Sequence, residues 1–379
     1  AGTRVQESRN YVLMPASGAG TAGANYDATA YGYDDMGRRW RVKDATGTIN
    51  RSVYDTLGRT VETWTGTNDS NFTGGEPSGT PTMAKVSVTE YDGNADKGNS
   101  YVTKRTLDPD GDWATTTDQR VTTYTNDARG RALLVTNPQA PHVLSNYDNL
   151  GRVTASATYS STASITAGTT DPKGSMTNDK ANRLGLNETF YDERGQVWKT
   201  VRHSITLATG VDADSVTSLN WYDPEGRSIK RRAESGLSKA RYDRLGRATH
   251  SFSLAQDNDG TTYSNVYASG QTDVAGDIVL QEDQTTYDNS NKTGLALMRA
   301  TISRFHDDQV TGTTGALDTN LDGLPYKYTV TGTNNVKGRL QVTAMWYDTL
   351  DRLTDTAIYG TNGSGNASEL GQLKYRFDH

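Results

Sequence analysis

The 379-residue chain contains no cysteine and no stretch of 18 apolar residues. The lack of cysteine excludes disulfides, thiolate metal sites and thiol catalysis, and the lack of a long apolar run predicts no membrane-spanning helix in this segment. Phenylalanine is scarce, with 5 residues, and apolar residues make up 33% of the chain. Soluble domains usually contain about 45–50%. The sequence therefore predicts a thin core and much wetted surface.

The chain also lacks a strong excess of either charge. Its 39 basic and 45 acidic residues give a net charge of −6, and it contains no run of basic residues. Proteins that bind nucleic acid carry a basic patch or stripe. We therefore expect no nucleic-acid partner.

Tyrosine and glycine, in contrast, are plentiful, with 21 and 38 residues, and many belong to one repeated unit. The unit is Tyr-Asp-x-x-Gly-Arg, as in Tyr54–Arg59. Five copies are complete, one lacks the arginine and one lacks the glycine. The motif residues are Tyr33, Asp34, Gly37, Arg38, Tyr54, Asp55, Gly58, Arg59, Tyr147, Asp148, Gly151, Arg152, Tyr191, Asp192, Gly195, Tyr222, Asp223, Gly226, Arg227, Tyr242, Asp243, Gly246, Arg247, Tyr347, Asp348 and Arg352. A unit that recurs this often sets the architecture of the chain.

Other segments resemble the unit less closely. Tyr91-Asp92 and Tyr287-Asp288 keep only its first half. The segment from Tyr124 to Arg131 is interpreted as a copy stretched by two residues. Tyr26-Asp27 is interpreted as a degenerate copy, and Tyr11–Met14 as a strand that precedes the array.

Each unit predicts a strand, a tight turn and a second strand. Tyrosine favours pleated, half-buried positions, and aspartate accepts hydrogen bonds from the backbone N–H groups that follow it. The spacing from aspartate to glycine suits a type I turn followed by a glycine with positive φ. The arginine opens the returning strand, where its guanidinium can reach the aspartate.

The returning strands alternate in polarity, which is typical of strands with one packed face. We expect the second residue after each arginine (or Gln196) to lie on the packed face. These residues are Trp40, Val61, Leu133, Thr154, Trp198, Ile229, Thr249 and Thr354. The residue after each of them is polar in most units and is expected to face water. These residues are Arg41, Glu62, Leu134, Ala155, Lys199, Lys230, His250 and Asp355.

Insertions separate some of the units. Tyr33 and Tyr54 stand 21 residues apart, whereas Tyr242 and Tyr287 stand 45 apart. Inserted segments such as 160–182 are rich in turn-forming residues, and we expect them to form longer hairpin loops on one rim of the sheet. The apolar segment Thr293–Arg304 is compatible with a strand or a helix.

Units of this form and spacing resemble the YD repeats of bacterial Rhs (rearrangement hotspot) proteins, of toxin-complex shell proteins and of animal teneurins. The resemblance covers residues 26–379, and residues 1–25 form a lead-in strand and loop. It implies an all-β fold, in which repeated antiparallel hairpins form a spiralling sheet that curves into a hollow β-shell. Because the chain begins without Met and Phe377-Asp378 looks like half of another unit, we expect the array to continue beyond both ends of this segment.

The resemblance also implies a structural, non-enzymatic role. In bacterial members the shell encloses a C-terminal toxin domain, and in teneurins it serves extracellular adhesion. We expect this chain to encapsulate or display another, toxin-like domain within a secreted or cell-surface protein. The alternative is an adhesion scaffold whose inserts bind partner proteins or glycans. In either case the nearest partner is the rest of the same polypeptide.

Family members can carry a self-cleaving region with an Asp-Pro-x-Gly signature and catalytic aspartates. Asp108–Gly111 matches the signature, but it lies in the middle of the array and is interpreted as a turn. No catalytic residue is assigned, because the chain has no nucleophile elbow and no phosphate-binding loop. A carbohydrate-active enzyme with paired carboxylates is the third hypothesis.

Metal binding has one weak candidate. Asp318, Asn320 and Asp322 match the first half of a calcium loop, but Thr329 stands where such loops carry a bidentate glutamate. We interpret the segment as an Asp/Asn-rich turn in preference to a calcium site, and expect no cofactor. The five histidines show no metal-ligand spacing.

Overall fold

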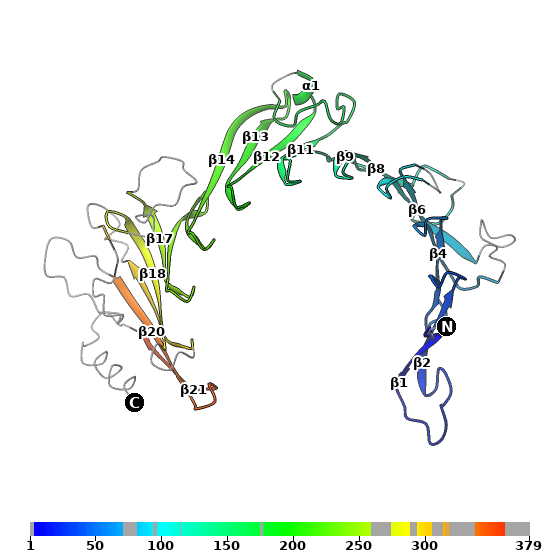
Figure 1. Cartoon of the computed structure of the whole chain (residues 1–379), viewed down its shortest axis with the longest axis horizontal. Helices are drawn as coiled ribbons and strands as arrows, with labels where there is room; N and C mark the ends of the chain where they lie inside the picture. Colours follow the sequence, from blue (N-terminus) through cyan, green and yellow to red (C-terminus); the bar gives the residue numbers. More distant parts are fainter. Residues whose placement is uncertain are drawn as a thin grey trace. The chain divides into compact units, whose positions relative to one another are not determined.

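The structure, a computed structural model, describes residues 4–70, 82–93, 97–113, 115–174, 177–258, 274–288, 294–304, 314–315, 317 and 338–360. These residues form 21 strands and one short helix, α1 (Thr177–Lys180). The strands belong to an antiparallel sheet and follow one another along the chain (Figure 1). The predicted all-β class with repeated antiparallel hairpins is confirmed.

The chain forms two compact units. The first comprises residues 1–187 and 203–213. Its strands are β1 (Glu7–Tyr11), β2 (Tyr26–Tyr33), β3 (Arg39–Lys43), β4 (Ile49–Tyr54), β5 (Thr60–Gly66), β6 (Met83–Tyr91), β7 (Val102–Leu107), β8 (Arg120–Asn126), β9 (Ala132–Thr136), β10 (His142–Tyr147) and β11 (Val153–Tyr159).

The second unit comprises residues 188–202 and 214–379. Three strands carry residues of both units: β12 (Arg183–Tyr191), β13 (Val197–Thr206) and β14 (Val211–Tyr222). The remaining strands are β15 (Ser228–Ala233), β16 (Gly236–Tyr242), β17 (Ala248–Gln256), β18 (Ile278–Tyr287), β19 (Ala296–Arg304), β20 (Gly338–Tyr347) and β21 (Leu353–Gly360).

Strand order gives each unit two distinct rims. From β1 to β11, and again from β14 to β21, each strand pairs antiparallel with its neighbours in sequence. The Tyr-Asp turns all follow even-numbered strands, so within a unit they share one rim, here called the turn rim. The long inserts follow odd-numbered strands and share the opposite rim, in agreement with the prediction.

The local geometry of the turns follows from the motif. In the turn after β4, the Gly58 N–H donates to the Asp55 carbonyl at 3.0 Å, and Gly58 has φ of 84°. The register shifts between Val53 and Tyr54, so that Tyr54 pairs with Thr60. This is a type I turn closed by a left-handed glycine bulge. The same register shift directly precedes the tyrosine in seven further Tyr-Asp hairpins, those of Tyr33, Tyr91, Tyr147, Tyr222, Tyr242, Tyr287 and Tyr347.

One face of the sheet is covered. In the first unit, Leu144, Ala157 and Tyr159 form a buried cluster against which Ile165 and Ala167 of the β11–β12 insert pack. In the second unit, a larger cluster on β17 to β20 includes two residues from outside the strands, Val274 and Leu317. The inserts therefore supply part of the core, and we call this face the covered face.

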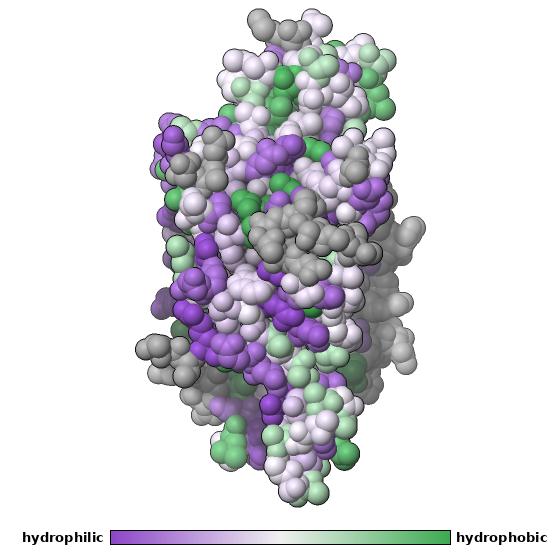
Figure 2. Space-filling model, turned by 90° about the vertical axis from the view of Figure 1, so that its right-hand side faces the viewer, coloured by the Kyte–Doolittle hydropathy of each residue, from purple (hydrophilic) through white to green (hydrophobic). Residues whose placement is uncertain are grey.

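The opposite, open face carries small polar side chains. In the second unit Ser238 pairs with Ser253, and Ser251 with Asp283. In the first unit Ser52 pairs with Thr63, and the Thr63 and Ser87 hydroxyls lie 2.6 Å apart. The side of the molecule drawn in Figure 2 shows mostly hydrophilic and neutral residues, with hydrophobic atoms in small separate groups, and does not display the open face by itself.

The predicted phase of the returning strands is wrong. The residues expected to face water include Leu134, Ala155 and Lys230, all of which are buried. Of the residues expected on the packed face, Ile229 alone is buried, Val61 is half-buried and Thr354 is exposed. The covered face tolerates charge when the charge is paired, and Lys230 lies 2.5 Å from Asp257. Polarity was therefore a poor guide to the buried side.

Two local predictions also change, and one open alternative is decided in favour of a strand. The first strand is Glu7–Tyr11, so Val12–Met14 follow it instead of forming it. Tyr26-Asp27 begins β2 and pairs with β1, so it is not a turn. The segment Thr293–Arg304 contains a strand, β19.

The aspartate that replaces the motif glycine in the last turn should be strained. Asp351 has φ of 61° and its N–H donates to the Asp348 carbonyl, as the glycine does elsewhere. A non-glycine residue in the left-handed region costs about 1–2 kcal/mol. Replacing it with glycine removes this cost, but glycine loses more conformational entropy on folding, which offsets part of the gain. Asp351→Gly should therefore raise the free energy of unfolding by up to about 1 kcal/mol.

The matched variant is Gly246→Ala, at a glycine with φ of 83° whose added Cβ would meet only an Arg227 nitrogen at 3.6 Å. It should lower stability by about 1–2 kcal/mol through the backbone alone. Urea unfolding followed by circular dichroism measures both. Equal stability of both variants and the parent chain would contradict this account.

Candidate functional site

The repeated Tyr-Asp turns are the chemically richest feature of the chain, and each is closed by its own aspartate. In the turn after β10, Asp148 Oδ1 accepts the Arg152 N–H at 2.9 Å and Oδ2 accepts Arg152 Nε at 2.6 Å. The Asp148 N–H donates to the Arg152 carbonyl at 2.9 Å. Six further turns repeat the bond from arginine Nε to aspartate, at 2.5–2.7 Å.

The arginine also reaches the next turn along the rim. Arg131 Nη1 donates to the Asp148 carbonyl at 3.0 Å, and its guanidinium lies 4.7 Å from the Tyr147 ring centre. Arg38 makes the same two contacts with Asp55 and Tyr54, and Arg227 makes them with Asp243 and Tyr242. Each of these arginines therefore joins its own turn to its neighbour.

The tyrosine returns the contact in the other direction. The Tyr147 hydroxyl donates to the Ala132 carbonyl at 3.1 Å, and Ala132 directly follows Arg131. The same bond, to the residue after the preceding arginine, is made by Tyr54, Tyr91, Tyr242 and Tyr287. We call this linked series of aspartate, arginine and tyrosine contacts the turn row.

Where a turn departs from the motif, a different side chain or backbone group occupies the motif position and makes an equivalent contact. The supposed stretched copy from Tyr124 to Arg131 is a normal turn, in which Asn126 takes the tyrosine position and Asn126 Nδ2 donates to the Val102 carbonyl at 2.8 Å. After Tyr91, Tyr101 takes the arginine position, because the Tyr101 N–H donates to Asp92 Oδ1 and its carbonyl accepts the Asp92 N–H.

Gln196 is the weak point of the turn row. Its Nε2 donates to the Gly226 carbonyl at 2.9 Å, so it still reaches the next turn. Among the described residues, its buried Oε1 has no hydrogen-bond partner. A carboxamide cannot also supply the ion pair with Asp192 that arginine would make.

Hydrogen bonding lowers the pKa of several turn aspartates, among them Asp55, Asp127 and Asp148. For Asp127, the side chain and then the backbone N–H of Arg131 hold the carboxyl pKa below its usual value. For Asp148, the Arg152 N–H is the largest cause of the lowered pKa. At Asp55, burial acts to raise the pKa, but the backbone and side-chain hydrogen bonds from Arg59 outweigh it. The carboxylates are therefore ionised throughout the neutral range.

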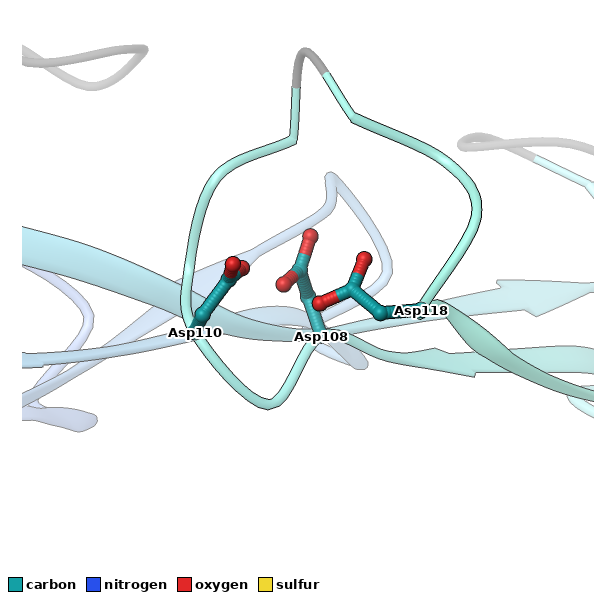
Figure 3. A group of neighbouring side chains, drawn as sticks. All are labelled: Asp108, Asp110 and Asp118. Carbon is teal, nitrogen blue, oxygen red and sulfur yellow. The ribbon is translucent and has the colours of Figure 1, made fainter.

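Three carboxylates meet in the loop after β7, which Figure 3 shows: Asp108, Asp110 and Asp118. Their oxygens lie within 4.8 Å of one another, which makes this the group of described residues that could hold a metal ion. Asp108 is buried, and burial followed by its hydrogen bond with Asp110 raises its pKa. The pKa of Asp110 is lowered, first by its hydrogen bond from the Asp112 N–H.

Existing partners already explain this cluster. Asp108 Oδ1 accepts the Gly111 N–H at 2.9 Å, and Oδ2 lies 3.4 Å from Gln119 Nε2. Gly111 has φ of 76°. Asp108–Gly111 is thus the turn that its sequence predicted, anchored by Asp108. The calcium candidates Asp318, Asn320 and Asp322 lie outside the described residues.

Buried ion pairs that the sequence did not reveal join the sheet to its inserts. Lys239 on β16 and Asp277 before β18 are fully buried, with Lys239 Nζ 2.6 Å from Asp277 Oδ2. In the first unit the buried Arg183 donates to the Pro172 and Gly210 carbonyls. Removing one partner of such a pair leaves the other charge buried without compensation, which lowers the free energy of unfolding by about 3–5 kcal/mol.

A pocket of about 470 Å³ lies at the ends of β15 to β17, beside the ion pair of Lys230 with Asp257. Asp257 is the one carboxylate in its lining, and both Lys230 and Arg232 bind it at 2.5 Å. His250, whose ring stacks on the buried Phe252 with 5.9 Å between ring centres, has its pKa lowered to about 4 by burial and then by Arg241. Neither feature offers an acid–base pair.

Comparison with known proteins yields structural likeness alone. No protein-family model matches the chain, and no curated protein matches its sequence. Among solved structures, the crystal structure of TcdB2-TccC3-Cdc42 matches 89% of this chain with 17% identity and a TM-score of 0.38. The crystal structure of TcdB2-TccC3 without its hypervariable C-terminal region matches 89% with 16% identity and a TM-score of 0.37.

The Photorhabdus luminescens Tc holotoxin pore also matches 89% of the chain, with 12% identity and a TM-score of 0.24. The chain spans 15% of the length of each of the first two structures and 22% of the third. All three TM-scores lie below 0.5, and the fold of this chain is established by its own strand pairing. No helix among the described residues is both long and apolar enough to cross a membrane.

Completing the motif at position 196 should stabilise the second unit. Gln196→Arg supplies an ion pair with Asp192 and a guanidinium for the Tyr222 ring, and removes the buried unpaired Oε1. We expect a gain of about 1 kcal/mol in the free energy of unfolding. Gln196→Lys adds the charge without the planar fork and should gain less. An equal gain from both substitutions in thermal unfolding would show that charge alone matters.

The turn aspartates should make the protein acid-labile. Hydrogen bonds hold the folded pKa values of five of them below the unfolded value of 3.8, so the stabilisation from these five is complete well above that pH and is lost as the pH falls through and below it. The five are Asp34, Asp127, Asp148, Asp243 and Asp348. We expect a flat thermal midpoint from pH 8 to about pH 5 and a steep fall below about pH 4. Asp148→Asn should lower the midpoint at pH 7 and shrink the acid-induced fall. An unchanged acid slope in that variant would assign the lability to other groups.

Proposed function

We propose that this chain is part of the wall of a structural, non-enzymatic β-shell that encloses or displays another, toxin-like domain of its own polypeptide. The observation that carries the proposal is the turn row. It links successive hairpins by the same contacts at a rim, and a repeated tether of this kind suits a wall more than a reaction centre. Because function in a wall is collective, every repeat needs the contact and none needs chemistry of its own.

The two faces of the sheet support the same proposal. The inserts seal the covered face with apolar residues and buried ion pairs such as Lys239 with Asp277. The open face presents hydroxyl groups such as those of Ser251 and Ser253. A wall needs one face that holds it together and another that does not adhere to what lies beside it. We place the enclosed domain against the open face.

The adhesion alternative receives less support from the described inserts. A binding loop needs free side chains, whereas Asp69 in the β5–β6 insert binds Arg41 and Arg51 on the sheet. Trp113 in the β7–β8 insert donates its indole N–H to the Lys85 carbonyl at 2.6 Å. These groups hold the inserts against the sheet. We further propose that the whole protein is secreted or displayed at the cell surface, in line with the toxin-complex chains that it resembles.

Protease protection of the natural full-length protein tests the proposal. The wall should resist trypsin and thermolysin at the Tyr-Asp turns, with first cuts in inserts such as 66–82, and should protect the enclosed domain. Lys239→Ala leaves Asp277 buried without its cation, so this variant should open the wall and expose both wall and passenger to cleavage. Glu90→Gln, at an exposed ion pair with Lys104, is the control and should change neither.

Two results would count against the proposal. Early cleavage inside the Tyr-Asp turns of the intact protein would contradict a packed wall. A resistant wall combined with a passenger that is cleaved as fast as in isolation would keep the wall but reject enclosure.

A further inference from the structure

The pocket at the ends of β15 to β17 forms where a short hairpin stands beside a longer strand. Two residues join β15 to β16, so this hairpin ends with the pair of Ala233 and Gly236. On the other side, Leu254 of β17 pairs with Leu237, and β17 then runs on to Gln256. The pocket of about 470 Å³ lies at this step, and every residue of its lining is described. Small-molecule sites usually enclose about 300–1,000 Å³.

Part of the pocket wall is apolar. Leu237 and Leu254 line it together with two alanines. Leu254 is buried and Leu237 is half-buried. Gly236 lines the pocket without a side chain, and a Cβ added there would meet no atom within 4 Å, so the space beside it is open. A ligand with a short aliphatic part would remove this apolar surface from water.

Three polar side chains of the lining have unused hydrogen-bond donors. Arg232 donates through Nη2 to Asp257, and its guanidinium makes no other hydrogen bond to a described residue. The Arg232 side chain is 28% exposed. The carboxamides of Gln256 and Asn258 make no hydrogen bond within the described part of the chain. All three groups can donate to an acceptor in the pocket, and an apolar wall with a few such polar groups is typical of a ligand site.

The charge of Arg232 selects an anion as the ligand. Asp257 is the one carboxylate in the lining, and its Oδ2 lies 2.5 Å from the buried Lys230. Arg232 is therefore bound by Oδ1 alone and keeps Nε and Nη1 for a second acceptor. Glu234 in the hairpin does not line the pocket and makes no ion pair with a described residue. A planar carboxylate matches the fork of N–H donors on an arginine.

We propose that this pocket binds a small aliphatic carboxylate. The carboxylate group of the ligand accepts N–H donors from Arg232 and from the two carboxamides, and its aliphatic part lies against Leu237 and Leu254. The site does not depend on the shell function proposed above, because the ends of three neighbouring strands form it by themselves.

Calorimetric titration of the 379-residue chain with sodium hexanoate tests the site. We expect saturable binding of a single equivalent. Acetate lacks the aliphatic part and 1-hexanol lacks the charge, so each should bind more weakly by about tenfold or more. Arg232→Gln removes the cation but leaves Asp257 its ion pair with Lys230, so the variant should fold and bind hexanoate more weakly by about tenfold or more.

The matched control is Arg231→Gln. Arg231 is exposed, pairs with Ser238 on the open face and does not line the pocket, so its loss should leave hexanoate binding unchanged. A photoreactive diazirine analogue of hexanoate locates the site without any substitution, and we expect its label on residues 232–237 and 254–258.

Four results would each overturn the proposal. They are the absence of saturable hexanoate binding, an equal loss of affinity in the two arginine variants, binding of 1-hexanol as strong as that of hexanoate, and photolabel confined to other parts of the chain.

Discussion

The arginine of the Tyr-Asp turn is the contact on which the rest of the structure depends. In one side chain it closes its own turn through Nε, donates to the next turn through Nη1 and covers the next tyrosine ring, as Arg131 does. Each bond is modest by itself, since part-exposed ion pairs contribute little. Their effect comes from repetition, because the same contacts recur between neighbouring hairpins within each unit.

That repetition leaves the other rim free to vary. Inserts of different length can follow the odd-numbered strands without disturbing the turn row, and they return over the covered face to fill its core. The buried pairs show how this is stabilised: Asp277 reaches Lys239 and Asp257 reaches Lys230 from segments that flank the β17–β18 insert. The charges on the covered face act as anchor points for the inserts, and the apolar residues around them exclude water.

The sequence predicted the turns well because their chemistry is local. Asp55 and Gly58 determine a type I turn with a glycine bulge within a few residues, whatever surrounds them. It predicted the faces of the strands poorly, because Lys230 looks like a solvated residue until Asp257, which is distant in sequence, is brought beside it. Asn126 was missed as a motif residue because its carboxamide replaces a phenol, a substitution visible only once its bond to Val102 is seen.

The links between turns could have been anticipated in part. A motif arginine followed by the tyrosine of the next unit, such as Arg131 and Tyr147, recurs along the sequence. The register that places the guanidinium over that ring depends on the bulge before each tyrosine, which the sequence does not show. The acidic cluster of Asp108, Asp110 and Asp118 could not have been anticipated, since Asp118 joins the other two only through the loop that follows β7.

Hydrogen exchange of the Arg131→Ala variant, whose side chain cannot reach the next turn, tests the central claim most directly. If the arginine links neighbouring turns, the Gly151 and Arg152 amides of the next turn should lose protection at least tenfold, together with those of the Gly130 turn. If the loss is confined to residues 127–131, each turn stands alone and the account of a linked turn row is wrong.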